Sequence, residues 1–196
     1  MLIFGLGGHA KVIVDVLLSK QILISGFFDD NLNAKPWHNF KFLGAYNIDI
    51  LSDESLVIAI GDNKIRKQIS ELVIHKFGNA IHATAQISQY SKVDKGTVVF
   101  HNAIIQANTL VGKHAIINTA AVVEHDCIIG DYVQIASNAT ICGGVHIAEG
   151  AWVGAGATVI PKVKIGKWAT VGAGSAVIND VADYEIVAGC PAKPIK

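Results

Sequence analysis

The 196-residue sequence has few cysteines, and this shortage excludes one class of protein. Only three cysteines occur, and they form no C-x-x-C pair: Cys127, Cys142 and Cys190. A sparse, odd number argues against the disulfide framework of a small secreted scaffold. It fits a reducing compartment, and we expect the protein to be cytoplasmic.

The sequence also lacks a net charge and a long apolar run. Its 16 basic and 16 acidic residues give a formal net charge of +0, so we expect no general attraction to nucleic acid or to an anionic membrane. No apolar run approaches the length of a membrane span. The apolar start MLIF is broken by Gly5 and has no basic leader, which favours a first β-strand over a signal peptide. With 51% hydrophobic residues, the composition predicts a soluble protein with a sizeable core.

A repeat of six residues dominates the rest of the sequence. Ile or Val occupies every sixth position from 87 to 177 without a break, and the residue four positions after each is small or β-branched. A period of six fits neither an α-helix nor a simple sheet. It fits a triangular coil with one short strand and one corner per hexad, in which residues 18 apart stack on one another. The pattern therefore predicts a parallel β-helix over residues 81–196, a little over five coils long.

Residues 1–80 follow a different pattern. MLIF, ISGFFDD and SLVIAIG are typical of strands, whereas KVIVDVLLSK and DNKIRKQISELVIHKF are typical of helices. This alternation predicts a small Rossmann-like α/β domain with a parallel sheet. Residues 31–54 show no clear pattern, and we predict no element there.

The first predicted strand leads into a glycine-rich turn, GLGGHA, that opens a helix. Its spacing matches G-x-G-x-x-A, and Asp29 and Asp30 follow about twenty residues later, as in the dinucleotide fingerprint. The alternative is a tight turn that only needs glycine. A complete NAD fold requires two βαβαβ halves, and about eighty residues supply one. The turn therefore favours a nucleotide-linked substrate over NAD, and Gly61 at the next strand-to-helix turn could line the same crevice.

A second motif lies within the hexads, where His125 stands between Glu124 and Asp126. The position 18 residues later is Gly143, so we expect a bare backbone next to the imidazole. The alternative is an exposed histidine between two solvated acids. We expect the other histidines at the surface: His38, His75 and His82 in loops or helix ends, and His101, His114 and His146 on the outside of the coil. No two histidines are 18 apart, and we expect no metal site.

Several segments together resemble one known family. The segments GLGGHAKVIVDV, FFDD, VIAIGDNKIRK, NTAAVVEHDCIIGD and AGCPAKPIK occur in that family's order along the whole chain. The chain resembles the sialic acid O-acetyltransferase/sugar N-acetyltransferase family of hexapeptide-repeat acyltransferases. Within it, the chain is most similar to the UDP-4-amino-sugar N-acetyltransferases of the bacillosamine pathway. The resemblance implies a left-handed coil, a homotrimer, and acetyl-CoA as co-substrate bound between neighbouring coils.

The same resemblance implies roles for individual residues. His125 would be the general base and Asp126, where the family often has Glu, the acid that orients it. The family's acetyl-CoA contacts fall on Gln134, where close relatives have histidine, and on Gly143, Ala155 and Ala173. The acceptor-binding residues implied by the resemblance are Asn118 in the coil and Gly7, Gly8, His9, Asp29, Asp30 and Gly61 in the first domain.

The residue types suit this chemistry. An amine that attacks a thioester must lose a proton, and a neutral imidazole with an adjacent carboxylate can take it. Cys127 lies close to His125 in sequence, but it occupies a small-residue position and is interpreted as packing rather than as a nucleophile. Three functions stay open from the sequence. They are N-acetylation of a UDP-4-amino-sugar, acetylation of a sialic acid or a GDP-amino-sugar, and sugar-nucleotide binding by a scaffold without catalysis.

Overall fold

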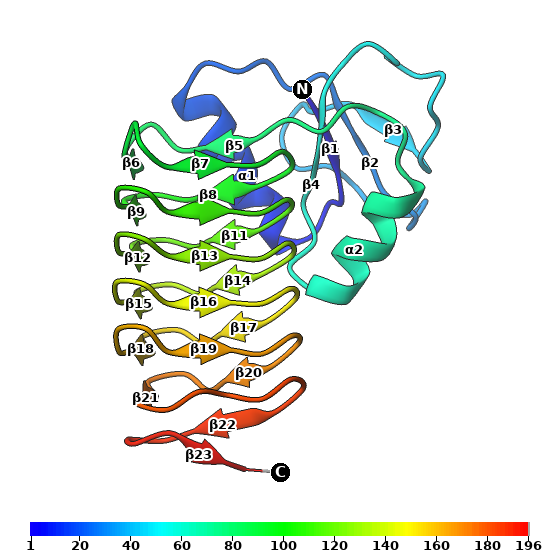
Figure 1. Ribbon diagram of the computed structural model, residues 1–196. Coiled ribbons are helices and arrows are strands. Elements are labelled where there is room, and N and C mark those ends of the chain that lie inside the picture. Colours follow the sequence, from blue (N-terminus) through cyan, green and yellow to red (C-terminus); the bar gives the residue numbers. More distant parts are fainter. Residues whose placement is uncertain (196) are drawn as a thin grey trace.

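A computed structural model describes residues 1–195, in which a small α/β layer structure lies beside one end of a long triangular coil (Figure 1). The first part contains a four-stranded parallel sheet in the order β3-β2-β1-β4. Its elements are β1 (Leu2–Phe4), α1 (Gly8–Ser19), β2 (Gly26–Phe28), β3 (Phe42–Gly44), β4 (Leu56–Ile58) and α2 (Asn63–Leu72).

The two helices cover opposite faces of this sheet. Buried residues of α1, including Ile13 and Leu17, pack between Phe27 of the sheet and Ile116 of the coil. On the other face, Ile69 of α2 packs in a separate cluster against the sheet. The helix α2 begins where Asp62 accepts hydrogen bonds at 2.9 Å from the backbone N–H groups of the first turn, a favourable N-cap.

The coil is a left-handed parallel β-helix with three walls (Figure 1). Each wall is a sheet of short strands, all of two residues except β22, and strands 18 residues apart are in register, as Val122 with Thr140 and Val123 with Ile141. The walls contain five, eight and six strands. The strands are β5 (Ala80–Ile81), β6 (Gln86–Ile87), β7 (Lys92–Val93), β8 (Val98–Val99), β9 (Ile104–Ile105), β10 (Leu110–Val111), β11 (Ile116–Ile117), β12 (Val122–Val123), β13 (Ile128–Ile129), β14 (Gln134–Ile135), β15 (Thr140–Ile141), β16 (His146–Ile147), β17 (Trp152–Val153), β18 (Thr158–Val159), β19 (Lys164–Ile165), β20 (Thr170–Val171), β21 (Ala176–Val177), β22 (Ile186–Ala188) and β23 (Lys193–Pro194).

The hexad pattern explains this coil residue by residue. The second residue of every strand from β6 to β21 is the Ile or Val of the repeat, and most of them form one buried core with the small residues that follow four positions later. Three positions after the inward residue, the backbone turns with a positive φ, as at Asn108 (+59°), Asp126 (+59°) and Gly144 (+70°). Gly, Asn and Asp tolerate this left-handed region best. The predicted fold class is therefore confirmed.

Two features of the fold were not predicted. The strand β3 lies within the stretch 31–54 and adds an edge to the first sheet by pairing with β2. The last coil is shorter than the others, because Thr170 pairs with Ile186, sixteen positions later. The predicted boundary between the two domains, after residue 80, stays a prediction.

Candidate active site

A histidine and a carboxylate meet at the corner between β12 and β13. His125 Nδ1 lies 2.7 Å from Asp126 Oδ2, and the Asn108 amide donates to Asp126 Oδ1 at 3.1 Å. The hydrogen bond with His125, and next that from Asn108, lowers the pKa of the Asp126 carboxyl. Because a carboxylate only accepts, Nδ1 carries the proton of this hydrogen bond, and in the neutral ring the lone pair is then on Nε2. The side chain of His125 is 62% exposed on the outside of the coil.

The imidazole of His125 lies over the backbone of Gly143. A Cβ atom placed on Gly143 would lie 2.7 Å from both Cε1 and Nε2 of the ring. The predicted stacking of these two positions is therefore present. Within residues 1–195, the Gly143 N–H donates to no protein acceptor. It is thus free to donate to a ligand beside the imidazole.

We expect Gly143→Ala to lower kcat by about tenfold to a hundredfold, because the new methyl group displaces the imidazole and a shift of about 1 Å can cost that much. Steady-state kinetics and the melting temperature check this result. Gly144→Ala is the matched control. It strains a left-handed position at a cost of about 1 kcal/mol, and its Cβ would lie near Lys162, at 3.4 Å, rather than near His125. Equal kcat losses in both variants would contradict the argument.

Cys127, beside this corner, is completely buried. Burial raises the pKa of its thiol, and Sγ lies 3.2 Å from the carbonyl oxygen of Cys142. A buried, protonated thiol is a poor nucleophile. The structure therefore agrees with the packing role predicted for Cys127.

The predicted nucleotide-binding residues lie along one edge of the first sheet. Because β2, β1 and β4 are neighbours and parallel, the turns that follow them meet at the same edge. Asp29 Oδ2 accepts a hydrogen bond from Leu6 N–H at 2.7 Å, which connects the end of β2 to the glycine turn. A Cβ on Gly7 or Gly8 would contact nothing within 4 Å, so the backbone there is open to a ligand. Asp30 is exposed.

His9 lies at the start of α1, with its ring against the edge of Phe100 at a centroid distance of 5.3 Å. Burial, and next the charge of Arg66, lowers the pKa of His9 to about 4, so the ring is neutral near pH 7. Its Nε2 is buried and has no hydrogen-bond partner within the part of the chain that the structure describes. This nitrogen could pair with a ligand that enters the edge.

A cleft of about 650 Å³ joins the first domain to the coil. The turn before α2 forms one side, and the outward side chains of β14, β17, β20 and β22 form the other. This cleft brings together two predicted site residues, Gly61 and Gln134, with nine residues that the sequence analysis did not select: Asp62, Asn63, Lys64, Gly150, Trp152, Trp168, Thr170, Tyr184 and Ile186. Trp152 and Thr170 lie 18 and 36 positions after Gln134 on the same wall. The 18-residue spacing in the sequence therefore contained a signal for both residues.

The remaining predicted residues lie at two different corners of the coil. Asn118, Ala155 and Ala173 follow strands β11, β17 and β20, at one end of the wall that contains β12, and Gly174 N–H donates to the Ala155 carbonyl at 2.8 Å. His125 and Gly143 lie at the other end of that wall. One chain therefore does not bring Asn118, Ala155 and Ala173 together with His125 and Gly143.

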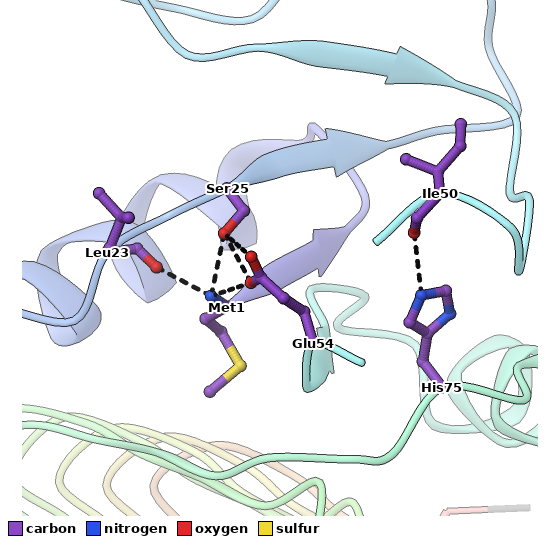
Figure 2. A network of polar contacts seen from close by, with 6 residues as sticks. All are labelled: Met1, Leu23, Ser25, Ile50, Glu54 and His75. Atoms are coloured by element: carbon purple, nitrogen blue, oxygen red, sulfur yellow. Dashed lines mark hydrogen bonds and ion pairs between the residues drawn. The ribbon is translucent and has the colours of Figure 1, made fainter. Parts of the chain in front are cut away.

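Two histidines are more buried than the sequence analysis expected. His75 is 2% exposed, and its Nε2 donates to the Ile50 carbonyl oxygen at 3.1 Å (Figure 2). Figure 2 also shows a separate polar contact, in which the Met1 amino group binds Glu54. His114 is 3% exposed, because α2 and its neighbours cover its corner of the coil and its ring stacks on Tyr132. The expected surface position was wrong for His75, whereas His114 faces outward from the coil as expected but is covered by the first domain.

Within residues 1–195, no three His, Cys, Asp or Glu side chains lie close enough together to hold a metal ion. Neither helix in this part of the chain has the length and apolar character needed to cross a membrane.

The three-walled coil of hexads places the chain in the class of hexapeptide-repeat transferases. Residues 1–73 match the PglD N-terminal domain family, and residues 108–143 and 144–179 match the bacterial transferase hexapeptide (six repeats). The chain belongs to the hexapeptide-repeat sugar N-acetyltransferases that carry a PglD-type N-terminal domain. It is accordingly classed as an acetyl-CoA-dependent acyltransferase, and the resemblance seen in the sequence is confirmed.

Three relatives illustrate this membership. UDP-N-acetylbacillosamine N-acetyltransferase of Bacillus subtilis (strain 168) is 40% identical over 106 residues, which are 50% of this chain and 49% of that protein. PerB of Caulobacter crescentus, solved with CoA and GDP-perosamine, is 33% identical with a TM-score of 0.94, covering 100% of this chain and 96% of that one. The acetyltransferase domain of PglB from Neisseria gonorrhoeae FA1090, solved with acetyl coenzyme A, is 30% identical with a TM-score of 0.89, covering 99% and 98%.

The curated relatives are longer than the matched part. The alignment spans 49% of the Bacillus subtilis protein and 21% of an uncharacterised mimivirus protein, L142, that is 34% identical over 104 residues.

Proposed function

We propose that this chain transfers the acetyl group of acetyl-CoA to the 4-amino group of a UDP-linked amino-sugar. The observation that carries the proposal is the His125–Asp126 pair stacked on Gly143, in a chain that also has a glycine-rich nucleotide turn. The solved relatives support both substrates, because PerB was captured with CoA and a GDP-linked sugar and the PglB domain with acetyl-CoA. The name of the Bacillus subtilis relative favours a UDP-linked acceptor.

In the proposed reaction, the amine of the sugar attacks the thioester carbonyl while Nε2 of His125 accepts its proton. Asp126 holds the Nδ1 proton and stabilises the imidazolium that forms. The Gly143 N–H donates to the oxyanion of the tetrahedral intermediate. The C–S bond then breaks, and the proton passes from His125 to the departing CoA thiolate. Transfer is direct, so no acyl-enzyme forms and no metal is needed.

The substrates divide between the two proposed domains. The nucleotide lies at the sheet edge of residues 1–80, with Gly7, Gly8 and His9 near the phosphates and Asp29 and Asp30 near the base or ribose. Acetyl-CoA contacts the coil, residues 81–196, and its arm passes four positions there: Gln134, Gly143, Ala155 and Ala173. Asn118 contacts the acceptor sugar.

We infer further that the enzyme is a homotrimer with acetyl-CoA between neighbouring coils. Because His125 and Asn118 lie at different corners of one chain, a site that uses both has to combine two chains, and a closed ring of three provides three equivalent boundaries. The free cysteines Cys127, Cys142 and Cys190 agree with a cytoplasmic location.

A substrate panel tests the proposed function. The purified chain is mixed with acetyl-CoA and UDP-, GDP- and dTDP-linked 4-amino-sugars or with free and CMP-linked sialic acid, and release of the CoA thiol is measured. We expect the highest kcat/KM with a UDP-4-amino-sugar. A GDP-amino-sugar or a sialic acid as the best substrate would establish the alternative acceptors. Tight nucleotide-sugar binding without thiol release from any of them would indicate a binding scaffold.

We expect Asp30→Ala to raise the KM for the acceptor by about tenfold while leaving the KM for acetyl-CoA nearly unchanged, because Asp30 lies in the proposed nucleotide domain. Asp29→Ala has the same effect on KM and also lowers the melting temperature, since it loses the hydrogen bond to Leu6 N–H. Bisubstrate kinetics measure both constants. If both variants weaken only acetyl-CoA, the proposed division of labour is wrong.

A further inference from the structure

One cation is buried where the two domains meet. The side chain of Arg66, in α2, is 1% exposed. Its guanidinium donates five hydrogen bonds of 2.8 to 3.0 Å, all to uncharged acceptors. They are the carbonyl oxygens of His114, Ile60, Gly61 and Tyr132 and the side-chain oxygen of Asn63.

Within the described part of the chain, no carboxylate forms an ion pair with this guanidinium. Among residues 1–195, no Asp or Glu oxygen lies within 4.0 Å of it. The negative charge of Asp62 is close enough to favour the charged form of Arg66, but the Asp62 carboxylate caps the start of α2. Burial lowers the pKa of Arg66 to about 10, so the side chain still carries its charge near pH 7. A buried cation without a matching anion is unusual, since its desolvation is only partly compensated by dipoles.

The position of this charge relates it to the nucleotide edge. Nη1 donates to the carbonyls of Ile60 and Gly61, so the guanidinium lies directly behind the turn that follows β4. Its charge also reaches the neighbouring glycine turn, where it contributes to the low pKa of His9. His9 is itself neutral near pH 7 and adds no positive charge there. In a low-dielectric interior, a charge acts over a longer range than it does in water.

We propose that Arg66 supplies the positive charge that makes this edge select a diphosphate-linked acceptor, acting from behind the Gly61 turn without touching the ligand. The inference rests on the proposed function. It adds that Arg66 is the reason why the nucleotide edge prefers an anionic acceptor. Arg66 is thus a positioning residue that acts through the field at the edge. A simple clasp between the domains is the competing role, and it predicts a different pattern of binding.

Calorimetric titration of the full-length protein distinguishes the two roles. The ligands are UDP and GDP, the uncharged nucleosides uridine and guanosine, and CoA. The variants are Arg66→Met, which removes the charge, and Arg66→Lys, which keeps it. Lys67→Met is the matched control, because Lys67 lies next in α2 and joins the coil through Glu149 at 2.6 Å.

We expect Arg66→Met to weaken binding of the preferred diphosphate by about tenfold or more, with less than a threefold change for the nucleoside and for CoA. Arg66→Lys should stay within about threefold of the unmodified protein, and Lys67→Met should change none of the affinities. Equal losses for nucleoside and diphosphate would overturn the proposal, since a displaced turn harms both.

Two further outcomes also decide the matter. If Arg66→Met does not fold, Arg66→Lys decides alone, because a tenfold loss of diphosphate binding despite the retained charge overturns the proposal. If the unmodified protein binds CoA but neither diphosphate, the nucleotide-linked acceptor fails and this inference fails with it. Unchanged diphosphate binding in Arg66→Met, with good binding by the unmodified protein, overturns only the inference.

Discussion

Replacing His125 by Ala is expected to lower kcat by about a hundredfold or more, because the amine then loses its proton acceptor. Folding should be unaffected. The side chain is 62% exposed, and within residues 1–195 its only hydrogen bond is to Asp126 on the coil surface. The measurements are thiol release under saturating substrates, and circular dichroism with thermal melting to compare the folds.

Two controls sharpen this experiment. Asp126→Asn should lose less than His125→Ala, because the amide can still accept the Nδ1 proton while it no longer stabilises the imidazolium. His146→Ala removes another exposed histidine of the coil, in β16, and should keep normal activity. A well-folded His125→Ala enzyme with near-normal turnover would remove His125 from the mechanism.

Mixing two inactive chains is expected to restore acetyl transfer. His125 and Asn118 lie at opposite ends of the wall containing β12, so a site that uses both takes them from two chains of a trimer. His125→Ala and Asn118→Ala chains are each expected to lose most activity. In trimers refolded from an equal mixture, half of the His125 corners and half of the Asn118 corners are intact. Random pairing thus makes about a quarter of the boundaries complete.

The measurement is thiol release by the mixture against each variant alone, with light scattering to determine the oligomeric state. A mixture no more active than its components would show that the two residues do not meet across a boundary. A monomer that is fully active at assay concentration would contradict the trimer, because one exposed corner would then have to bind the thioester by itself.

The interior of the coil and the neighbourhood of His125 could be predicted from the sequence because both follow from a strict period. Each hexad places one Ile or Val inward, and every third hexad returns to the same wall, so the contact of His125 with Gly143 follows from their separation of 18 positions. The glycine turn and the acids after β2 could be predicted for a similar reason, since neighbouring parallel strands end at one edge.

The docking of the first domain against the coil has no such period, and only the tertiary structure decided it. Whether a helix residue faces solvent or a neighbouring domain is not encoded by its spacing, and so the buried Arg66 and the buried ring of His114 were not foreseen. The cleft with Trp152 exists only because the turn before α2 lies against that wall. The sequence by itself determined the coil and the His125 corner through local periodicity. The tertiary structure decided the domain junction, where burial depends on contacts between segments far apart in the chain.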